Sequence, residues 1–356
     1  MSKTIVLTGG GSGGHVTPNL ALLPYLKERG YEVHYIGTHD GIERQLVQGI
    51  PYHAIQAGKF RRYMSVRNIT DPFRTLAGYF DAKKILKELN PSVVFCKGGF
   101  VSVPVAFAAH SLHIPTILHE SDYTPGLANR LCIPKADKIC LSFDACAEKY
   151  GGRAVVTGSP IRRELLRGNR QKGLALCNLP DNKPVLMIMG GSLGAATLND
   201  IVDANIDGLL REFSIIHLRG KGNLNKLLHI KKGYAQFEYI SVEMPDLFAA
   251  ADIVLSRAGA NAVFEFLALK KPALLIPLPL SASRGDQILN AKFFEKNGYA
   301  AMLEQEKLSG GLLVDSLRDL YQNRKNYMQA MNAAKAASGT ENVLNVIYAT
   351  EKSYEY

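Results

Sequence analysis

A run of glycines followed by a histidine is the part of the sequence best suited to chemistry. Residues 9–15 read Gly-Gly-Gly-Ser-Gly-Gly-His and follow a short apolar stretch at residues 4–7. Glycines let backbone N–H groups approach a phosphate or a sugar, and the helix expected next turns its positive end toward the same place. The His15 side chain ordinarily has a pKa near neutrality, which suits a general base. The loop therefore predicts an anion- or sugar-binding site with a candidate base beside it.

Two other interpretations of this loop stay open. The spacing of Gly9, Gly11 and Gly14 also fits a dinucleotide-binding loop, which would make the protein an NAD(P)-dependent oxidoreductase. Such a site needs an acidic residue about 20 residues further on, at the end of the second strand. The strand expected at residues 33–36 is preceded, not followed, by Glu32, so this requirement is poorly met. The other interpretation is a tight turn that binds nothing, with the histidine capping the helix or orienting a substrate.

The second half of the chain repeats this pattern. Residues 190–195 read Gly-Gly-Ser-Leu-Gly-Ala after an apolar strand, and they could hold a diphosphate through N–H groups and the Ser192 hydroxyl. A later cluster of small residues opens a helix that carries Glu265, whose carboxylate could accept both hydroxyls of a ribose. Asp286 and Gln287 follow another predicted strand and suit sugar hydroxyls. The competing interpretations are a surface or ion-paired Glu265 and a plain helix cap at residues 286–287.

Further polar residues follow two predicted strands of the first half, at residues 93–96 and 116–118. The sequence Lys-Gly-Gly-Phe occupies residues 97–100, and Glu120 and Asp122 come directly after the second of these strands. Ligands of doubly wound folds bind at the carboxyl ends of the strands, so these groups should lie near the glycine loop. Glu120 and Asp122 are alternative general bases, or they orient the histidine or satisfy loop N–H groups.

Short β-branched runs alternate with amphipathic helices along the whole chain, which predicts α/β architecture with parallel, doubly wound sheets. Because the rhythm pauses in a polar stretch at residues 158–184 and then restarts, we predict two facing Rossmann-like domains separated by a deep cleft. The domains are placed at 1–162 and 163–340, with a helix at 341–356 packing back on the first. In the second domain we expect, among others, a strand at 238–241 and helical structure over 308–336.

The composition narrows the function classes. Of the 356 residues 47% are hydrophobic and 21% charged, which excludes a disordered or fibrous protein. We expect neither a signal peptide nor a membrane span, and the five scattered cysteines form no metal-binding pattern. The net charge of +10 indicates an anionic partner: nucleic acid, a membrane surface or a phosphorylated substrate.

Half of this positive excess lies in residues 59–88, which hold eight basic and three acidic residues with aromatic side chains between them. This mixture favours docking on an anionic membrane, while a helix covering the core and an RNA-binding segment are the alternatives. The residues singled out as membrane or acceptor contacts are Arg61, Arg62, Arg67, Phe73, Arg74, Tyr79 and Phe80.

Taken together, the motifs resemble those of the MurG family, transferases of the GT-B fold that move GlcNAc from UDP-GlcNAc to lipid I. The resemblance covers essentially the whole chain. It is carried by GGGSGGHVTP (9–18), GGFVSVP (98–104), HESDYTPGLAN (119–129), GSPIR (158–162), GGSLGA (190–195), SRAGANAVFE (256–265) and SRGDQILNA (283–291).

The resemblance implies an inverting transfer of GlcNAc to the 4-hydroxyl of MurNAc-pentapeptide on undecaprenyl diphosphate, giving lipid II, without a metal or other cofactor. It also implies a peripheral protein on the cytoplasmic face of the bacterial membrane, with other cell-wall enzymes as partners and no nucleic acid. The candidate catalytic residues are then His15, Glu120 and Asp122. The implied donor-side positions are Ser12, Gly13, Gly14, Asn129, Arg162, Ser192, Ser241, Ala260, Asn261, Ala262, Val263, Phe264, Glu265 and Gln287.

Three positions depart from the family pattern. Other members carry Asn in place of Asp122, Gln in place of Leu193 and Gln in place of Asp286. An ionised Asp only accepts hydrogen bonds and cannot replace an amide donor. Gln287 is therefore the better candidate than Asp286 for GlcNAc.

Two alternatives of the same fold stay open. A related transferase with another lipid acceptor fits because acceptor specificity lies in loops, and a UDP-GlcNAc 2-epimerase shares the paired-domain fold and the donor but needs no lipid-binding patch.

Overall fold

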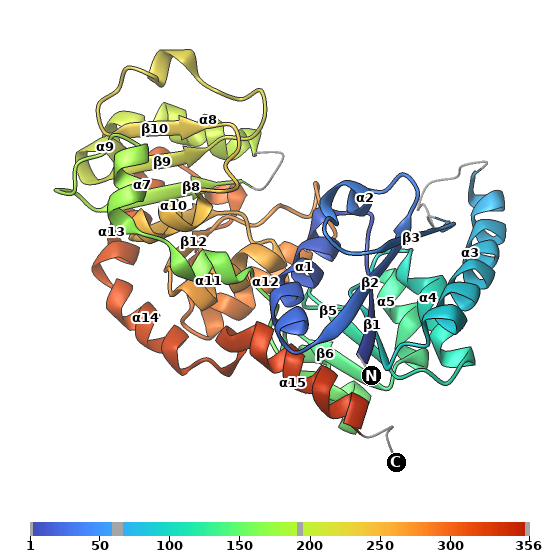
Figure 1. Cartoon of the computed structure of the whole chain (residues 1–356). Helices are drawn as coiled ribbons and strands as arrows, with labels where there is room; N and C mark the ends of the chain where they lie inside the picture. The colour runs from blue at the N-terminus through green and yellow to red at the C-terminus, as the bar shows by residue number, and fades with distance from the viewer. Residues whose placement is uncertain (1–2, 59–66, 191–194, 353–356) are drawn as a thin grey trace. The chain divides into compact units, whose positions relative to one another are not determined.

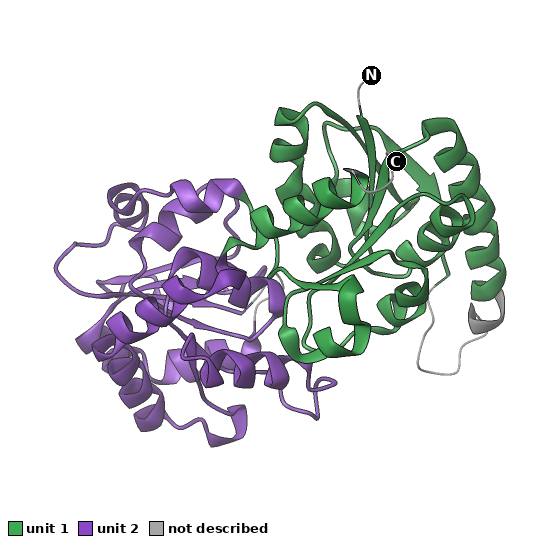
Figure 2. Ribbon diagram, turned by 90° about the horizontal axis from the view of Figure 1, so that it is seen from below, with its two compact units in different colours: residues 1–162, 338–356 green, residues 163–337 purple. Residues whose placement is uncertain are grey.

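The computed structural model describes residues 3–58, 67–190 and 195–352, without the side chains of residues 67–70 and 352. The chain divides into two compact units (Figure 2). Unit 1 comprises Met1–Arg162 and Ser338–Tyr356, and unit 2 comprises Arg163–Ala337.

Unit 1 is built on a parallel seven-stranded sheet with the order β3-β2-β1-β4-β5-β6-β7 (Figure 1). The chain runs outward from β1 in one direction and then returns to add β4 on its other side, so the order reverses between β1 and β4. The loops after these two strands flank the point where doubly wound sheets bind ligands. The strands are β1 (Lys3–Thr8), β2 (Tyr31–Thr38), β3 (Tyr52–Ile55), β4 (Val93–Cys96), β5 (Thr116–Glu120), β6 (Lys138–Leu141) and β7 (Ala154–Val156).

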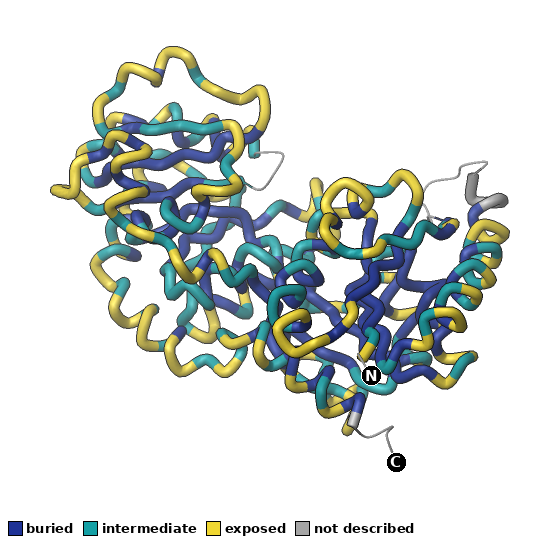
Figure 3. Tube along the Cα trace, in the orientation of Figure 1, coloured by how far each residue is buried: buried dark blue, intermediate teal, exposed yellow. Residues whose placement is uncertain are grey.

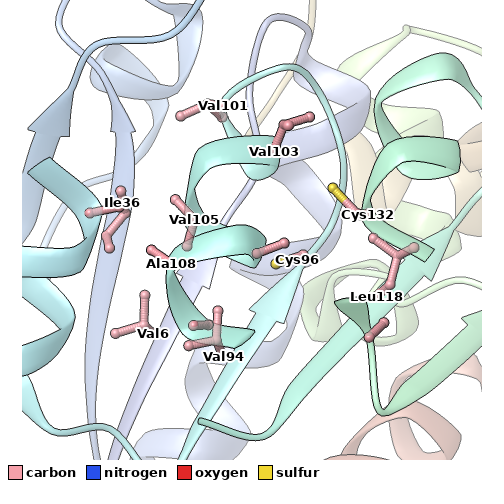
Figure 4. Close-up of a cluster of buried hydrophobic side chains, with 14 of the residues drawn as sticks. Val6, Ile36, Val94, Cys96, Val101, Val103, Val105, Ala108, Leu118 and Cys132 are labelled. Carbon is pink, nitrogen blue, oxygen red and sulfur yellow. The ribbon is translucent and has the colours of Figure 1, made fainter. Parts of the chain in front are cut away.

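Helices cover both faces of this sheet, and its central strands are buried on both sides, as a parallel sheet requires. On one face Val6 and Val94 pack with Val105 and Ala108 of α4 (Figure 4). On the other face Ile347 of α15 joins the core. The helices are α1 (Gly13–Glu28), α2 (Ile42–Leu46), α3 (Arg67–Leu89), α4 (Ser102–Ser111), α5 (Leu127–Cys132), α6 (Ala147–Tyr150) and α15 (Gly339–Lys352).

Specific polar contacts fasten α15 to unit 1. The Tyr31 hydroxyl donates to the Glu351 carboxylate over 2.6 Å, and the Asn342 side chain donates to the Thr157 carbonyl over 2.9 Å. Burial, together with the hydrogen bond to this carboxylate, raises the pKa of Tyr31. The end of the chain is thus part of the first unit.

Unit 2 repeats the plan with a parallel six-stranded sheet of order β10-β9-β8-β11-β12-β13, which reverses between β8 and β11. Its strands are β8 (Val185–Met189), β9 (Ser214–Leu218), β10 (Tyr234–Phe237), β11 (Ile253–Ser256), β12 (Ala273–Leu275) and β13 (Ala300–Met302). Its α-helices are α7 (Arg170–Leu176), α8 (Ala196–Ala204), α9 (Ile206–Glu212), α10 (Met244–Ala250), α11 (Ala260–Leu269), α12 (Asp286–Lys296), α13 (Gly310–Gln322) and α14 (Arg324–Ala333).

The predicted α/β class and the doubly wound parallel sheets are confirmed, but some elements differ from expectation. The strand expected at 238–241 lies earlier, at β10, where the Gln236 side chain fixes the edge strand by donating to the Asn225 carbonyl. The single helical stretch expected over 308–336 is two helices. Their break is at Asn323, whose backbone N–H and side chain both donate to the Asp319 carbonyl at 3.0 Å.

Candidate active site

The loop after β1 contains glycines of two kinds. A Cβ atom on Gly9 would lie 2.4 Å from the His15 carbonyl oxygen, and one on Gly10 would lie 2.5 Å from the Glu43 carboxyl carbon. Close packing therefore requires glycine at both positions. A Cβ on Gly11 or Gly13 would meet no atom within 4 Å, although Gly11 needs glycine for its φ of +80°. The first two glycines serve the fold, and Gly11 and Gly13 border open space where a ligand can approach.

A buried carboxylate that the sequence analysis did not find holds this loop in place. Glu43 of α2 is fully buried and accepts hydrogen bonds from the Gly11 N–H at 3.0 Å and the Thr38 hydroxyl at 2.6 Å. Burial alone would raise the pKa of Glu43, but these hydrogen bonds hold it below its usual value. A pyrophosphate of NAD(P) would need the loop N–H groups, and here a carboxylate already occupies one of them. This geometry opposes the dinucleotide interpretation.

His15 lies in the first turn of α1, where two contacts fix its tautomer. Its Nδ1 lies 3.0 Å from the Gly10 carbonyl oxygen and 3.1 Å from the Ser12 hydroxyl. A carbonyl oxygen only accepts, so Nδ1 carries the proton and Nε2 carries the lone pair. Burial and the positive charge of Lys97 lower the pKa of His15 to about 4, so the imidazole is neutral at physiological pH. A neutral imidazole with its lone pair on Nε2 is the form that a general base requires.

Lys97 directly follows β4 and is completely buried. Its ammonium group donates to the Ser121 hydroxyl, on the loop after β5. Burial lowers the pKa of Lys97 to about 8, while the nearby carboxylates of Glu120 and Asp122 oppose this shift. No role for this lysine was predicted from the sequence; in the structure it is the cation that links the ends of β4 and β5.

Glu120, a candidate base, has both carboxylate oxygens in use. Oε1 accepts from the Asp122 N–H at 2.9 Å, while Oε2 accepts from the Gly126 N–H at 3.0 Å and from the Asn129 side chain at 2.8 Å. The residue is 6% exposed, and burial raises its pKa. This geometry fits a carboxylate that organises the loop between β5 and α5. Asp122 lies on that loop and is partly exposed.

Gly98 brings two predicted site residues together. Its φ is +111°, and a Cβ on it would lie 3.0 Å from Asn129 Oδ1 and 3.4 Å from His15 Cδ2. The His15 ring and the Asn129 amide therefore approach the same glycine at the point where the strand order reverses. Asn129 is 5% exposed, and its Oδ1 has no hydrogen-bond partner among the described residues. Ser12, Gly13 and Gly14 line the start of α1 at the same edge.

In unit 2 the loop after β11 lies at the corresponding point of reversal. Helix α11 begins at Ala260, and its first N–H groups point back toward this loop, as at any helix N-terminus. Val263 and Phe264, two predicted donor contacts, are buried in the core, and Phe264 packs edge-on against Phe294. Their side chains are therefore turned away from any ligand. The other predicted contacts on this helix are Ala260, Asn261, Ala262 and Glu265, of which Glu265 is partly exposed.

The remaining donor positions are less closely placed. Gln287 lies in the first turn of α12, where its Oε1 accepts from the Leu278 N–H at 3.1 Å. Ser241 is exposed in the loop after β10, not at a strand end. Arg162 ends unit 1, and its Nε is buried with no hydrogen-bond partner in the described part of the chain. Ser192 lies outside the described residues. The donor roles of these residues stay predictions.

The predicted membrane segment is only partly described. Arg61 and Arg62 lie outside the described residues, as does the side chain of Arg67. On α3, Phe73 is 71% and Phe80 61% exposed, with Leu76 between them on the same face and Arg74 exposed beside them. Tyr79 differs from this group because it packs on the core and donates to the Ser111 hydroxyl. No helix in the described ranges is both long and apolar enough to cross a bilayer.

Comparison with known proteins assigns the family. Residues 5–141 match the N-terminal domain of glycosyltransferase family 28, and residues 185–346 match its C-terminal domain. The chain belongs to glycosyltransferase family 28. It is 52% identical over 358 aligned residues to the UDP-N-acetylglucosamine--N-acetylmuramyl-(pentapeptide) pyrophosphoryl-undecaprenol N-acetylglucosamine transferase of Clostridium tetani, with 99% of each chain covered.

Among solved structures, this family 28 enzyme is similar to MurG. The MurG structure from Acinetobacter baumannii aligns with a TM-score of 0.74 and 26% identity, covering 98% of this chain and 99% of that one. The predicted MurG resemblance is thus confirmed. The UDP-GlcNAc 2-epimerase of Neisseria meningitidis aligns with a TM-score of 0.67 at 14% identity, covering 98% and 99%, which shows a shared fold alone.

Proposed function

We propose that this family 28 enzyme transfers GlcNAc from UDP-GlcNAc to the 4-hydroxyl of N-acetylmuramyl-pentapeptide on undecaprenyl diphosphate. Lipid I is thereby converted to lipid II. The observation that carries the proposal is the identity of 52% along nearly the whole chain to the Clostridium tetani transferase. The other arrangements support it: a glycine loop with a neutral histidine in unit 1, and a small-residue loop opening α11 in unit 2.

In the proposed reaction His15 is the general base. Its Nε2 accepts the proton of the acceptor hydroxyl as that oxygen attacks the anomeric carbon, while the C–O bond to UDP breaks on the opposite side. The result is inversion at the anomeric carbon and a transition state with oxocarbenium character. The Gly10 carbonyl holds the protonated Nδ1, so the ring is oriented before the acceptor arrives.

The donor is held by unit 2 in this proposal. The diphosphate meets the N-terminus of α11, where backbone N–H groups and the helix dipole stabilise the charge that develops on the departing UDP. Glu265 accepts from the ribose hydroxyls, and Gln287 bonds the GlcNAc. Gly259, as the residue before the helix, lets the diphosphate approach closely: a Cβ there would meet no atom within 4 Å.

A direct assay tests the function. The purified chain is incubated with UDP-GlcNAc carrying a radioactive sugar and with a water-soluble analogue of the MurNAc-pentapeptide diphosphate lipid. We expect label in a disaccharide product and release of UDP. Conversion of UDP-GlcNAc to its 2-epimer without label transfer would overturn the proposal in favour of an epimerase.

Removing the Glu265 carboxylate should weaken donor binding. A hydrogen bond to a charged group contributes roughly 1.5–3 kcal/mol, so Glu265→Ala should raise the KM for UDP-GlcNAc by about 10- to 100-fold. The kcat should change much less, because the ribose is remote from the reacting bond. Steady-state kinetics with varied donor measure both. Glu295→Ala, at an exposed position of α12, is the control. An unchanged KM in Glu265→Ala would contradict the proposed contact between Glu265 and the ribose.

We place the enzyme on the cytoplasmic face of the membrane, with the apolar face of α3 as one contact. Phe73 and Phe80 present large exposed rings beside Arg74. Burying a Phe side chain contributes at least about 1.5 kcal/mol, so the double variant Phe73→Gln/Phe80→Gln should bind anionic vesicles roughly a hundredfold more weakly. Vesicle sedimentation measures this. Leu312→Gln/Met328→Gln, two exposed apolar residues of unit 2, should bind normally, and an equal loss in both variants would contradict the assignment.

A further inference from the structure

The loop between β9 and β10, residues 220–233, exposes three aliphatic side chains. Leu227 is 82% and Ile230 91% exposed, and Leu224 is 47% exposed. The loop lies along the outer edge of the unit 2 sheet, next to β10, and much of its trace is exposed (Figure 3). Exposure of aliphatic side chains to water is unfavourable, so a cluster of them on a surface indicates a site that a partner covers.

The local fold holds these side chains outward. Asn225 caps the short 3-10 helix Lys226–Leu228 by accepting from the Leu227 N–H at 3.0 Å, and its N–H donates to the Gln236 side chain of β10 at 2.9 Å. Leu228 points the other way and is buried in the unit 2 core. The loop is thus anchored at Asn225 and Leu228, while Leu227 lies within the 3-10 turn and Leu224 and Ile230 flank it, all three exposed.

The charge of the loop is of one sign. Residues 220–233 contain four lysines and no acidic residue. Lys231 pairs with Asp207, whereas Lys221, Lys226 and Lys232 are exposed around the apolar residues. Exposed aliphatic tips within a ring of lysines are typical of surfaces that enter the headgroup region of an anionic bilayer.

Other partners fit this surface less well. The loop contains no Phe, Tyr or Trp and no exposed Arg. Base stacking on single-stranded nucleic acid needs aromatic side chains, and the strongest contacts of protein interfaces come from Trp, Tyr and Arg. A lipid surface needs neither, because flexible lysines and aliphatic tips suffice.

We propose that the loop 220–233 is a second membrane-docking surface, by which unit 2 binds the headgroups of an anionic bilayer. This inference deepens the proposed function, since the acceptor of that reaction is a membrane lipid. Stable peripheral anchoring generally needs two signals, because a single one binds weakly and reversibly. The face of α3 is the contact proposed for unit 1, and the loop 220–233 is the one proposed for unit 2.

The absence of Trp from the chain allows a direct test. Three single-Trp variants are prepared in the full-length protein: Ile230→Trp in the loop, Phe80→Trp on α3 and Leu312→Trp as a control on α13. Each is mixed with vesicles of phosphatidylcholine, alone or with phosphatidylglycerol. With anionic vesicles we expect a blue shift of emission and quenching by brominated acyl chains for Trp at 230 and at 80, and neither effect at 312.

Lysine substitutions then test the electrostatic part. Near an anionic membrane each lysine strengthens binding about fivefold, so Lys221→Gln, Lys226→Gln and Lys232→Gln together should weaken partitioning of the Ile230→Trp protein roughly a hundredfold at low salt. Unchanged thermal melting and an unchanged stabilisation by UDP-GlcNAc would show that unit 2 remains folded.

The outcomes separate this proposal from the earlier ones. A shift at 80 without a shift at 230 overturns the second surface and leaves the α3 contact standing. Absence of both shifts overturns membrane docking but not the transferase reaction, which is measured on a soluble acceptor. A shift at 230 that grows with protein concentration in the absence of vesicles would indicate contact between copies of the chain and would also overturn the proposal.

Discussion

Replacing His15 by alanine is expected to lower kcat by about 10²- to 10⁴-fold, the usual contribution of a general base. The variant loses the lone pair of His15 Nε2, which is available because Nδ1 donates to the Gly10 carbonyl. The KM for UDP-GlcNAc should stay close to normal, because the donor contacts are assigned to unit 2. Steady-state kinetics on the soluble acceptor analogue, with both substrates varied, measure the two parameters.

The direction in which activity changes with pH follows from the protonation of His15. A base must be unprotonated to act, so activity that depends on His15 is lost as the pH falls through the pKa of its imidazole. That pKa is about 4, because burial and Lys97 disfavour the charged form. Between pH 8 and pH 6 His15 protonation should therefore not limit kcat. A pH profile with an acidic limb near 6.5 would contradict the buried, neutral histidine.

Two comparisons keep the assignment of the base open to refutation. Ser12→Ala should retain most of the activity, because the Gly10 carbonyl still orients the ring. Asp122→Asn restores the residue of other family members and should also remain active. Near-normal kcat in His15→Ala, with a large loss in Asp122→Asn, would move the base from the histidine to the aspartate.

The fold was largely predictable because parallel sheets leave a strong local signal. Buried strands such as β1 and β8 contain continuous apolar runs, at residues 5–7 and 185–189, and each strand is followed in the sequence by glycines. Edge strands leave less trace. β10 carries Gln236 within the strand and depends on the side-chain pairing with Asn225, so the local pattern misplaced it. Contacts between distant residues decided this element.

The candidate site was predictable in its residue types but not in their roles. Glu120 ends β5 and His15 lies in the first turn of α1, and from the sequence alone either could be the base. In the structure the Glu120 carboxylate accepts from three donors, whereas His15 donates through Nδ1 and keeps the lone pair of Nε2. This difference is why we propose His15, and not Glu120, as the base. Glu43 was not found because it belongs to a separate short helix, and only folding brings it under the glycine loop.

One departure from the family pattern has a structural counterpart. Asp286, where the resemblance predicts Gln, forms an ion pair with Arg284 at 2.8 Å. The guanidinium of Arg284 thus compensates the negative charge of the Asp286 carboxylate. Gln at position 286 would lose the ion pair and gain an amide donor, so Asp and Gln at this position would contact a sugar differently. Gln287 therefore stays the predicted GlcNAc contact.

Glu120→Ala is expected to lower the free energy of unfolding substantially. The substitution leaves the Asp122 N–H, the Gly126 N–H and the Asn129 amide without their acceptor in a largely buried place. Each unsatisfied donor costs about 1–3 kcal/mol, and partial hydration of the loop should bring the total to roughly 3–5 kcal/mol. Activity should fall as well, because the loop that leads into α5, and so positions Asn129 near the His15 ring, is no longer fixed.

Urea unfolding followed by circular dichroism measures the loss, with Glu148→Ala, an exposed glutamate of unit 1, as the matched control. A surface substitution of that kind should change stability by less than about 0.5 kcal/mol. Glu120→Gln separates the two roles of the residue. If Glu120 anchors the loop, the stability of Glu120→Gln should lie between those of the wild type and Glu120→Ala. The amide carbonyl still accepts some of the hydrogen bonds, whereas the amide NH₂ group cannot accept the others. A Glu120→Gln protein with wild-type stability and a 10²-fold or greater loss of kcat would instead make this carboxylate the general base.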